Sequence, residues 1–212
     1  MNRITIRSLS LALGLAVLAG CGGGGPDNGL RNKNPGDNDV NVVAAVGDSI
    51  TLGDRCECVP YPARLQERIG KTVVNAGLSG SMAIENVDRV RTVIQASRPG
   101  FLLILYGHND ITHGVQTSTI AEALRSMAEI CLEEHVVPVL ATYPEPTGDH
   151  AAYAPRELAL NDRVRDLARD LGIACVDLEK EFAGGEDLTI GDGLHPNDAG
   201  TQIIALAFAD LF

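Results

Sequence analysis

Aromatic residues are scarce in this 212-residue sequence, which has no tryptophan, four tyrosines and four phenylalanines. Such a chain has few rings on which nucleic-acid bases can stack. Basic residues are also few, since 17 Lys and Arg stand against 28 Asp and Glu, for a formal net charge of −11. Binding to phosphate backbones needs a surplus of Lys and Arg on one face. We therefore expect no nucleic acid among the partners of this protein.

Long hydrophobic runs are missing as well. The apolar run from Leu9 to Gly20 is shorter than the roughly 20 residues that span a bilayer. It follows a short start that contains Arg3 and Arg7 and no acidic residue. A basic start, a short apolar run and small residues at its end are typical of a secretory signal peptide. We assign residues 1–20 to such a signal.

The signal ends in Leu18-Ala19-Gly20-Cys21. This tetrapeptide resembles the bacterial lipobox, in which the Cys is lipidated and becomes the first mature residue. A plain signal peptide with an incidental Cys21 is the alternative. Residues 21–40 are rich in Gly, Pro, Asn and Asp and are too polar to offset the entropy of ordering them. We expect a lipidated Cys21, a flexible tether over 21–40 and a folded domain over 41–212, anchored to a membrane of the bacterial cell envelope at the outer membrane or periplasmic face.

Export would place the remaining four cysteines in an oxidising compartment, where disulfides persist. Three full pairings of these four are conceivable. We favour Cys56–Cys58 with Cys131–Cys175, because the first two are neighbours in the sequence. A metal site built on Cys-x-Cys lacks a second ligand cluster at suitable spacing, so we expect no metal.

The rest of the chain alternates between two kinds of segment, and 45% of all residues are hydrophobic. Apolar runs with the length and flanks of buried strands lie at 42–46, 72–75, 101–106, 136–142 and 173–178. Helical spacing of apolar residues occurs at 62–69, 84–96, 119–134, 156–171 and 198–211, with Ser118 as an expected N-cap. This alternation predicts a single α/β domain, a three-layer α/β/α fold of flavodoxin-like type with a central parallel sheet of about five strands.

Polar residues stand where the predicted strands end. Ser49 follows the first strand, in Gly47-Asp48-Ser49. Near the C-terminus Asp192 precedes His195 by three residues, close enough to accept the Nδ1 proton of the imidazole and leave Nε2 free for a serine hydroxyl. Because the carboxyl ends of parallel strands share one edge of the sheet, these side chains are expected to meet there.

Two further loops supply hydrogen-bond donors to the same edge. The segment 75–80 follows the second strand and ends at Gly80, whose backbone N–H is open to a ligand. Gly107-His108-Asn109-Asp110 follows the third strand, and Asn109 offers an amide. A tetrahedral intermediate of acyl transfer needs such donors around its oxyanion.

Along the chain, the segments around Ser49, Gly80, Asn109 and His195 follow one another in this order and resemble the four sequence blocks of the SGNH (GDSL-type) hydrolases. The resemblance extends from Val42 to the C-terminus. It implies Ser49 as nucleophile, His195 as general base and acid, and Asp192 as the residue that orients His195. It also implies an oxyanion hole formed by the N–H groups of Ser49 and Gly80 and the side chain of Asn109. Ile50 stands where the family name implies Leu, and the Cys56–Cys58 insertion follows the nucleophile.

Other catalytic motifs fail on inspection. A Gly-x-Ser-x-Gly elbow would need Gly where Thr51 stands, and a phosphate-binding loop ahead of Gly70-Lys71-Thr72 would need Gly at Leu65. No cofactor is implied. Among the histidines, His113 and His150 are expected to be solvated in loops and His135 to be structural, whereas His108 is placed to line a substrate pocket.

The sequence therefore predicts a serine esterase that works through an acyl-enzyme. Two alternatives stay open: a non-catalytic, envelope-anchored binding module, and an O-acyltransferase that uses the same residues. The expected partner is a small ester, such as a lipid, an aryl ester or an acetylated glycan. Lysophospholipase, thioesterase, aryl esterase and carbohydrate acetylesterase activities share these blocks. We expect an open groove shaped by the loops 53–61 and 143–154.

Overall fold

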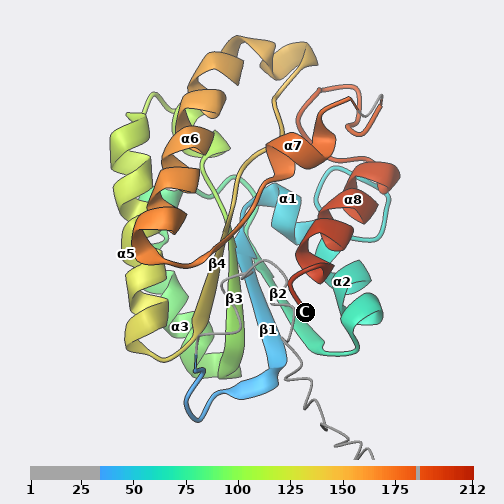
Figure 1. Ribbon diagram of the computed structural model, residues 1–212. Coiled ribbons are helices and arrows are strands. Elements are labelled where there is room, and N and C mark those ends of the chain that lie inside the picture. The colour runs from blue at the N-terminus through green and yellow to red at the C-terminus, as the bar shows by residue number, and fades with distance from the viewer. Residues whose placement is uncertain (1–33, 185–186) are drawn as a thin grey trace, which may run out of the picture.

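The computed structural model describes residues 34–184 and 187–212, which form a parallel sheet between two layers of helices (Figure 1). The predicted signal peptide, Cys21 and most of the predicted tether lie outside these residues. The strands are β1 (Asp39–Gly47), β2 (Thr72–Gly77), β3 (Pro99–Leu105), β4 (Val137–Ala141) and β5 (Ala174–Val176). They pair in the order β2-β1-β3-β4-β5, and each pairing is parallel. The predicted fold class is confirmed.

Helices cover both faces of this sheet. One face carries α3 (Val87–Ser97), α5 (Thr117–Glu133) and α6 (Ala154–Leu171), and the other carries α2 (Tyr61–Ile69) and α8 (Asp198–Ala209). Each layer has its own apolar core, because successive residues of a strand point to opposite faces. Ala44 and Val46 of β1 belong to the first core, whereas Val43 and Ala45 belong to the second.

Short helices follow several strands and were not predicted from the sequence. These are α1 (Ser49–Leu52), η1 (Ala83–Glu85), α4 (His108–Thr112), η2 (Gly148–Tyr153) and α7 (Leu178–Phe182), where η denotes a 3₁₀ helix. Three to six residues are too few for a helical apolar period to show in a sequence. Three of them, α1, α4 and η2, carry residues of the site described below.

Two details at element ends differ from the predictions. Strand β1 begins at Asp39, two residues before the expected start of the domain, and Asn38 donates from its side chain to the carbonyl of Glu134 at 2.9 Å. Ser118 is not an N-cap, since α5 begins at Thr117 after Gln116, whose side chain makes no capping hydrogen bond. The residue at which a helix begins also depends on its contacts with the neighbouring segments. The preference of Ser for N-cap positions does not account for those contacts.

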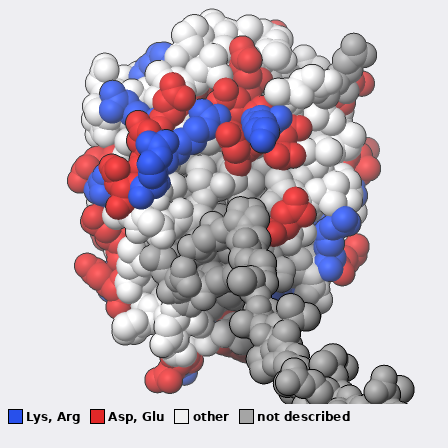
Figure 2. Space-filling view, viewed as in Figure 1, with Lys and Arg blue, Asp and Glu red and all other residues white. Residues whose placement is uncertain are grey.

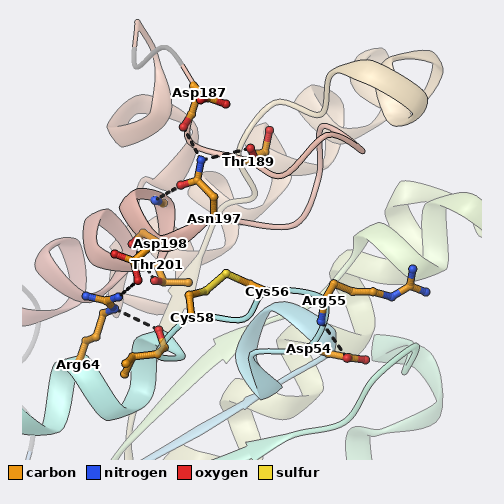
Figure 3. The surroundings of a disulfide bond; sticks show 12 residues. Asp54, Arg55, Cys56, Cys58, Arg64, Asp187, Thr189, Asn197, Asp198 and Thr201 are labelled. Atoms are coloured by element: carbon orange, nitrogen blue, oxygen red, sulfur yellow. Dashed lines mark hydrogen bonds and ion pairs between the residues drawn. A yellow bond between two sulfur atoms is a disulfide. The ribbon is translucent and has the colours of Figure 1, made fainter.

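One of the two predicted disulfides is present in the structure. Cys56 and Cys58 form a disulfide, but Cys131 and Cys175 are free thiols, so the second predicted bond is wrong. Cys131 lies on the buried face of α5, and Cys175 lies on the short strand β5. Both therefore serve as small apolar core residues. Figure 3 shows the Cys56–Cys58 bond between Asp54 and Arg55 and the start of α8, where Arg64 pairs with Asp198.

Charged side chains of both signs are mixed on the face shown in Figure 2. On α6, Arg165 contacts Asp177 and Glu179, each at 2.7 Å, and Arg169 contacts Asp166 at the same distance. The basic groups there are thus neutralised by neighbouring acids. None of the helices within the described residues is both long and apolar enough to cross a bilayer.

Candidate active site

Ser49 lies at the carboxyl edge of the sheet, at the first position of α1. The preceding residue, Asp48, caps this helix by accepting the N–H of Ile50 at 3.1 Å. Gly47 leaves no room for a side chain, since a Cβ there would lie 2.1 Å from Thr51 Oγ1 and 2.6 Å from the Leu105 carbonyl oxygen. The tight turn after the central strand β1 therefore determines where the serine hydroxyl is held.

His195 reaches Ser49 from the segment before α8. The distance from Ser49 Oγ to His195 Nε2 is 2.9 Å, although the two residues are 146 positions apart. On the other side of the ring, His195 Nδ1 lies 2.7 Å from Asp192 Oδ2. A carboxylate accepts the Nδ1 proton, so Nε2 of a neutral ring is left to accept from the serine hydroxyl. The three residues predicted from the sequence are thus brought together in the predicted order.

Asp192 is held by the backbone that follows it. Its Oδ1 accepts the N–H groups of Leu194 at 2.9 Å and His195 at 3.0 Å, across a turn in which Gly193 has φ +77°. Partial burial alone would raise the pKa of this carboxyl, but the hydrogen bonds from Leu194 and His195 outweigh it and hold the pKa below its usual range. Asp192 therefore stays ionised beside His195 at neutral pH.

The predicted oxyanion donors all border the same cleft. Within the residues that the structure describes, the N–H groups of Ser49 and Gly80 donate to no protein acceptor. Asn109 Nδ2 donates to the carbonyl of Ser81 at 3.1 Å and to Asp48 Oδ2 at 3.3 Å. The two backbone donors are available as they stand, whereas the amide of Asn109 is held by other acceptors.

Asp48 is an acid buried next to the serine. Its Oδ2 also accepts the hydroxyl of Tyr143, which follows β4. Burial raises the pKa of Asp48 to about 6, although the hydrogen bonds from Tyr143 and Ile50 oppose the rise. This link between two loops at the strand ends was not anticipated from the sequence.

Asp110 anchors the loop beyond Gly80. It is fully buried, and its two oxygens accept the N–H groups of Ala83 at 2.8 Å and Ile84 at 3.2 Å, at the start of η1. Burial raises the pKa of this carboxyl against those hydrogen bonds. Asp110 thereby ties the loop that carries Gly80 to the helix α4 that carries Asn109.

The cleft over Ser49 has a volume of about 560 Å³. Arg55 reaches it from the first loop that was expected to shape it, and Asp149, His150 and Tyr153 reach it from the second. Most of its lining is polar. The residues that line it are Asp48, Ser49, Ile50, Arg55, Ser79, Gly80, His108, Asn109, Thr112, Tyr143, Asp149, His150, Tyr153, Asp192, Leu194 and His195.

Two histidines and a buried glutamate form a second hydrogen-bonded chain at this cleft. His108 Nδ1 lies 2.7 Å from Glu157 Oε2, and His108 Nε2 lies 2.9 Å from His150 Nδ1. His108 lines the cleft as predicted, and His150 is half-exposed but lies in η2 with its ring hydrogen-bonded to His108, instead of standing free in a loop. Sequence reasoning missed Glu157, which shares a face of α6 with the buried Leu160 and Val164. A charged residue on an apolar helix face was the available signal.

The other two histidines lie away from this chain. His113 ends α4, and its Nδ1 lies 2.7 Å from the carbonyl oxygen of Asn109. His135 has φ +56° at the turn into β4, and its carbonyl accepts from Asn38, in keeping with the predicted structural role. Within 34–184 and 187–212, no group of three or more His, Cys, Asp or Glu side chains is arranged to hold a metal ion.

A serine, a histidine and a carboxylate aligned at the carboxyl edge of a parallel sheet, beside free backbone N–H groups, is the arrangement of a hydrolase that attacks ester carbonyls. The chain belongs to the GDSL-like Lipase/Acylhydrolase family, whose model matches residues 45–203. It is accordingly a hydrolase that acts on ester bonds, and the resemblance to SGNH hydrolases is confirmed.

Similar proteins come from several bacteria. The chain is 28% identical over 205 residues to "Uncharacterized lipoprotein YqeF" of Bacillus subtilis, covering 81% of this chain and 79% of that protein. It is 25% identical over 171 residues to "Thioesterase 1/protease 1/lysophospholipase L1" of Escherichia coli K12, covering 78% and 80%. A solved member of the lipolytic protein G-D-S-L family from Veillonella parvula superposes with a TM-score of 0.71 at 17% identity, covering 81% and 97%. This last likeness shows the fold.

Proposed function

We propose that the protein hydrolyses carboxylic esters through an acyl-enzyme on Ser49. As Ser49 Oγ attacks the ester carbonyl carbon, His195 Nε2 takes the hydroxyl proton. The carbonyl oxygen becomes negative and accepts from the N–H groups of Ser49 and Gly80. The bond to the alcohol then breaks, and the alcohol oxygen takes the proton from His195. The acyl group remains on Oγ.

Water completes the cycle by the same route. It gives a proton to His195 as its oxygen attacks the acyl carbon, and a second tetrahedral intermediate forms. The bond to Ser49 Oγ breaks, Oγ recovers the proton, and the carboxylic acid leaves. Asp192 stabilises the imidazolium that forms in each half of the cycle, because its carboxylate lies 2.7 Å from Nδ1.

Asn109 is the third donor to the oxyanion. Its amide has two hydrogens, which are directed at Asp48 and Ser81. Ser81 offers a neutral carbonyl at 3.1 Å, whereas Asp48 offers a carboxyl at 3.3 Å. Asn109 joins the oxyanion hole when the substrate oxyanion replaces one of these two acceptors.

The observation that carries this proposal is the chain of hydrogen bonds from Ser49 through His195 to Asp192, at 2.9 and 2.7 Å. A fluorophosphonate probe, which forms a bond between phosphorus and an activated serine oxygen, tests it. Wild-type protein should be labelled on Ser49 and should hydrolyse a short aryl ester. Ser49→Ala should lose both labelling and at least about 10³-fold in kcat.

The matched control is Ser126→Ala, which removes an exposed hydroxyl of α5 that bonds only to the carbonyl of Glu122. This variant should be labelled and active like the wild type. Equal hydrolysis by wild type and Ser49→Ala would refute the assignment of the nucleophile. A protein that binds esters but takes no label, under conditions that modify a reference esterase, would instead be a binding module.

The domain works at a membrane surface of the cell envelope, where a lipid on Cys21 holds it. The lipobox-like segment and the polar tether after it support this placement. A relative that carries the name lipoprotein supports it further. The expected substrates are then esters of envelope lipids or glycans.

A further inference from the structure

The chain Glu157–His108–His150 repeats the order of acid, imidazole and hydrogen-bond donor found in Asp192–His195–Ser49. Glu157 and His108 are almost completely buried, with exposed fractions of 0% and 2%. Burial raises the pKa of Glu157 against the hydrogen bond from His108. A buried polar group of this kind costs stability unless its partners are well placed. The proposed reaction at Ser49 does not use this second hydrogen-bonded chain.

With Glu157 ionised and both rings neutral, the hydrogen bonds determine which nitrogen of each ring carries a proton. Glu157, when ionised, can only accept, so His108 Nδ1 is the donor and Nε2 of a neutral His108 is an acceptor. His108 Nε2 therefore accepts from His150 Nδ1–H at 2.9 Å. The remaining nitrogen of His150, Nε2, is then an unprotonated acceptor. It has no protein partner within the described residues.

Aromatic rings hold the two imidazoles in place. The His108 ring stacks on Tyr143 at 6.1 Å between centroids and meets Tyr153 edge-on at 5.8 Å. The His150 ring lies 4.9 Å from the His108 ring. Burial, together with the neighbouring His108, lowers the pKa of His150. These contacts favour the neutral ring that an acceptor requires.

The segment that carries His150 is fastened to the loop of the catalytic histidine. The N–H of Thr147 donates to the carbonyl of Gly193 at 2.8 Å, and the N–H of Asp149 donates to that of Asp192 at 3.2 Å. His150 and His195 line the same cleft. Since His195 protonates the leaving alcohol in the proposed reaction, the alcohol part of the substrate must lie at His195. Nε2 of His150 is therefore placed to accept a hydrogen bond from the alcohol part of the substrate.

The composition of the cleft agrees with a polar alcohol. Ile50 and Leu194 are the aliphatic side chains among its lining residues, and imidazoles, carboxylates, hydroxyls and amides make up most of the remainder. A hydrophobic pocket discriminates poorly between substrates that differ by a hydroxyl. A site built to hydrogen-bond that hydroxyl rejects the analogue that lacks it.

We propose that His150 is a specificity-determining residue that accepts a hydrogen bond from a free hydroxyl of the substrate's alcohol part, and that His108 and Glu157 are the positioning residues that keep its Nε2 unprotonated. The enzyme thereby selects esters of polyhydroxylated alcohols, such as glycerol or a sugar, over esters of simple alkanols. This inference rests on the proposed ester hydrolysis at Ser49.

A matched pair of substrates tests it. Glycerol 1-acetate and n-propyl acetate share their acyl group and carbon chain and differ by two hydroxyls. Wild-type enzyme should have the higher kcat/KM on glycerol 1-acetate. His150→Leu should lower the ratio of kcat/KM on glycerol 1-acetate to kcat/KM on n-propyl acetate about tenfold, as expected for the loss of one hydrogen bond. His150→Gln, which keeps a side-chain acceptor, should recover part of the loss.

His108→Phe tests the positioning role. Phenylalanine keeps the ring contacts with Tyr143 and Tyr153 but cannot accept from His150. It should reduce the preference for glycerol 1-acetate as His150→Leu does, chiefly through KM.

The outcomes separate this inference from the proposed function. If fluorophosphonate labels Ser49 and n-propyl acetate is hydrolysed, the function stands. An unchanged ratio of the two kcat/KM values in His150→Leu would then overturn the role of His150. An equal loss on both substrates would also overturn it, because His150 would then serve the structure or the chemistry in general. If neither substrate is hydrolysed and Ser49 takes no label, the proposed function itself fails.

Discussion

Asp48 borders the catalytic serine, and burying its charge there lowers the stability of the folded protein at neutral pH. Its carboxyl is buried beside Ser49, and burial raises its pKa from the usual 3.8 to about 6. Between pH 3.8 and pH 6, such a carboxyl is protonated in more of the folded molecules than of the unfolded molecules. Its contribution therefore favours the folded protein in acid and is lost as the pH rises from 3.8 to 6. At neutral pH the ionised Asp48 opposes folding.

Asp48→Asn should thus raise the relative stability of the protein more at pH 7.5 than at pH 4. The shift of about two pKa units corresponds to roughly 3 kcal/mol in the difference between variant and wild type over that range, as an upper bound. Urea unfolding of both proteins at the two pH values measures it. A difference in unfolding free energy that is the same at pH 4 and pH 7.5 would contradict the raised pKa.

At this scale the sequence predicts well the three aligned residues. Ser49 stands directly after a strand of the parallel sheet, and Asp192 and His195 are spaced so that the carboxylate can reach Nδ1 of the imidazole. Glu157 was not, because a glutamate within a helical pattern is usually solvent-exposed, and only the register with Leu160 places it in the core. The chain from Glu157 to His150 depends on packing between α6 and α4, which no local pattern reports.

The turn between β1 and α1 has no space for any side chain at Gly47. A Cβ there would meet Thr51 Oγ1, which bonds to the buried Tyr61 hydroxyl, and the backbone oxygen of Leu105 on β3. Backbone atoms of a central strand cannot move without shifting the sheet. Gly47→Ala should therefore destabilise the protein by about 1–3 kcal/mol, the usual range for overpacking, and displace Ser49.

Unfolding by urea and turnover of an aryl ester measure the two effects of Gly47→Ala. The matched control is Gly191→Ala, because a Cβ at Gly191 would meet no atom within 4 Å. The control should stay within about 0.5 kcal/mol of the wild type. Equal stability of Gly47→Ala and Gly191→Ala would show that the turn tolerates a side chain.

Long elements were predictable and short ones were not. The helices α2, α3, α5, α6 and α8 follow from apolar periods over many residues, and the five strands follow from continuous apolar runs. The 3₁₀ helix η2 has no buried residue, so it leaves no apolar pattern, yet it carries His150 to the cleft. Its position depends on backbone hydrogen bonds to the carbonyls of Asp192 and Gly193, which are nearly fifty residues away.

In the whole molecule, the sheet and its long helices could be predicted from the sequence. The lining of the cleft could not, because it depends on contacts between residues that are far apart in the chain. The alternation of apolar runs with segments of helical spacing correctly indicated an α/β fold, and the order of four short segments correctly indicated the family. The free thiols of Cys131 and Cys175 show what the sequence could not predict. A sequence gives the number of cysteines, but whether two of them lie close enough to form a disulfide depends on the fold. The placement of the molecule in the cell envelope stays a prediction from its first 40 residues.

The remaining prediction therefore concerns the full-length chain in a bacterial cell. A lipid on Cys21 would make the domain sediment with membranes, since stable anchoring requires buried acyl chains that the acidic domain surface does not supply. Cys21→Ala should abolish incorporation of labelled palmitate and leave the domain's esterase activity unchanged, because Cys21 is not among the residues that line the cleft over Ser49. Fractionation of the cells followed by an aryl ester assay measures both. Membrane-bound, labelled Cys21→Ala protein would show that another residue or segment anchors the enzyme, and unlabelled wild type would identify residues 1–20 as a plain export signal.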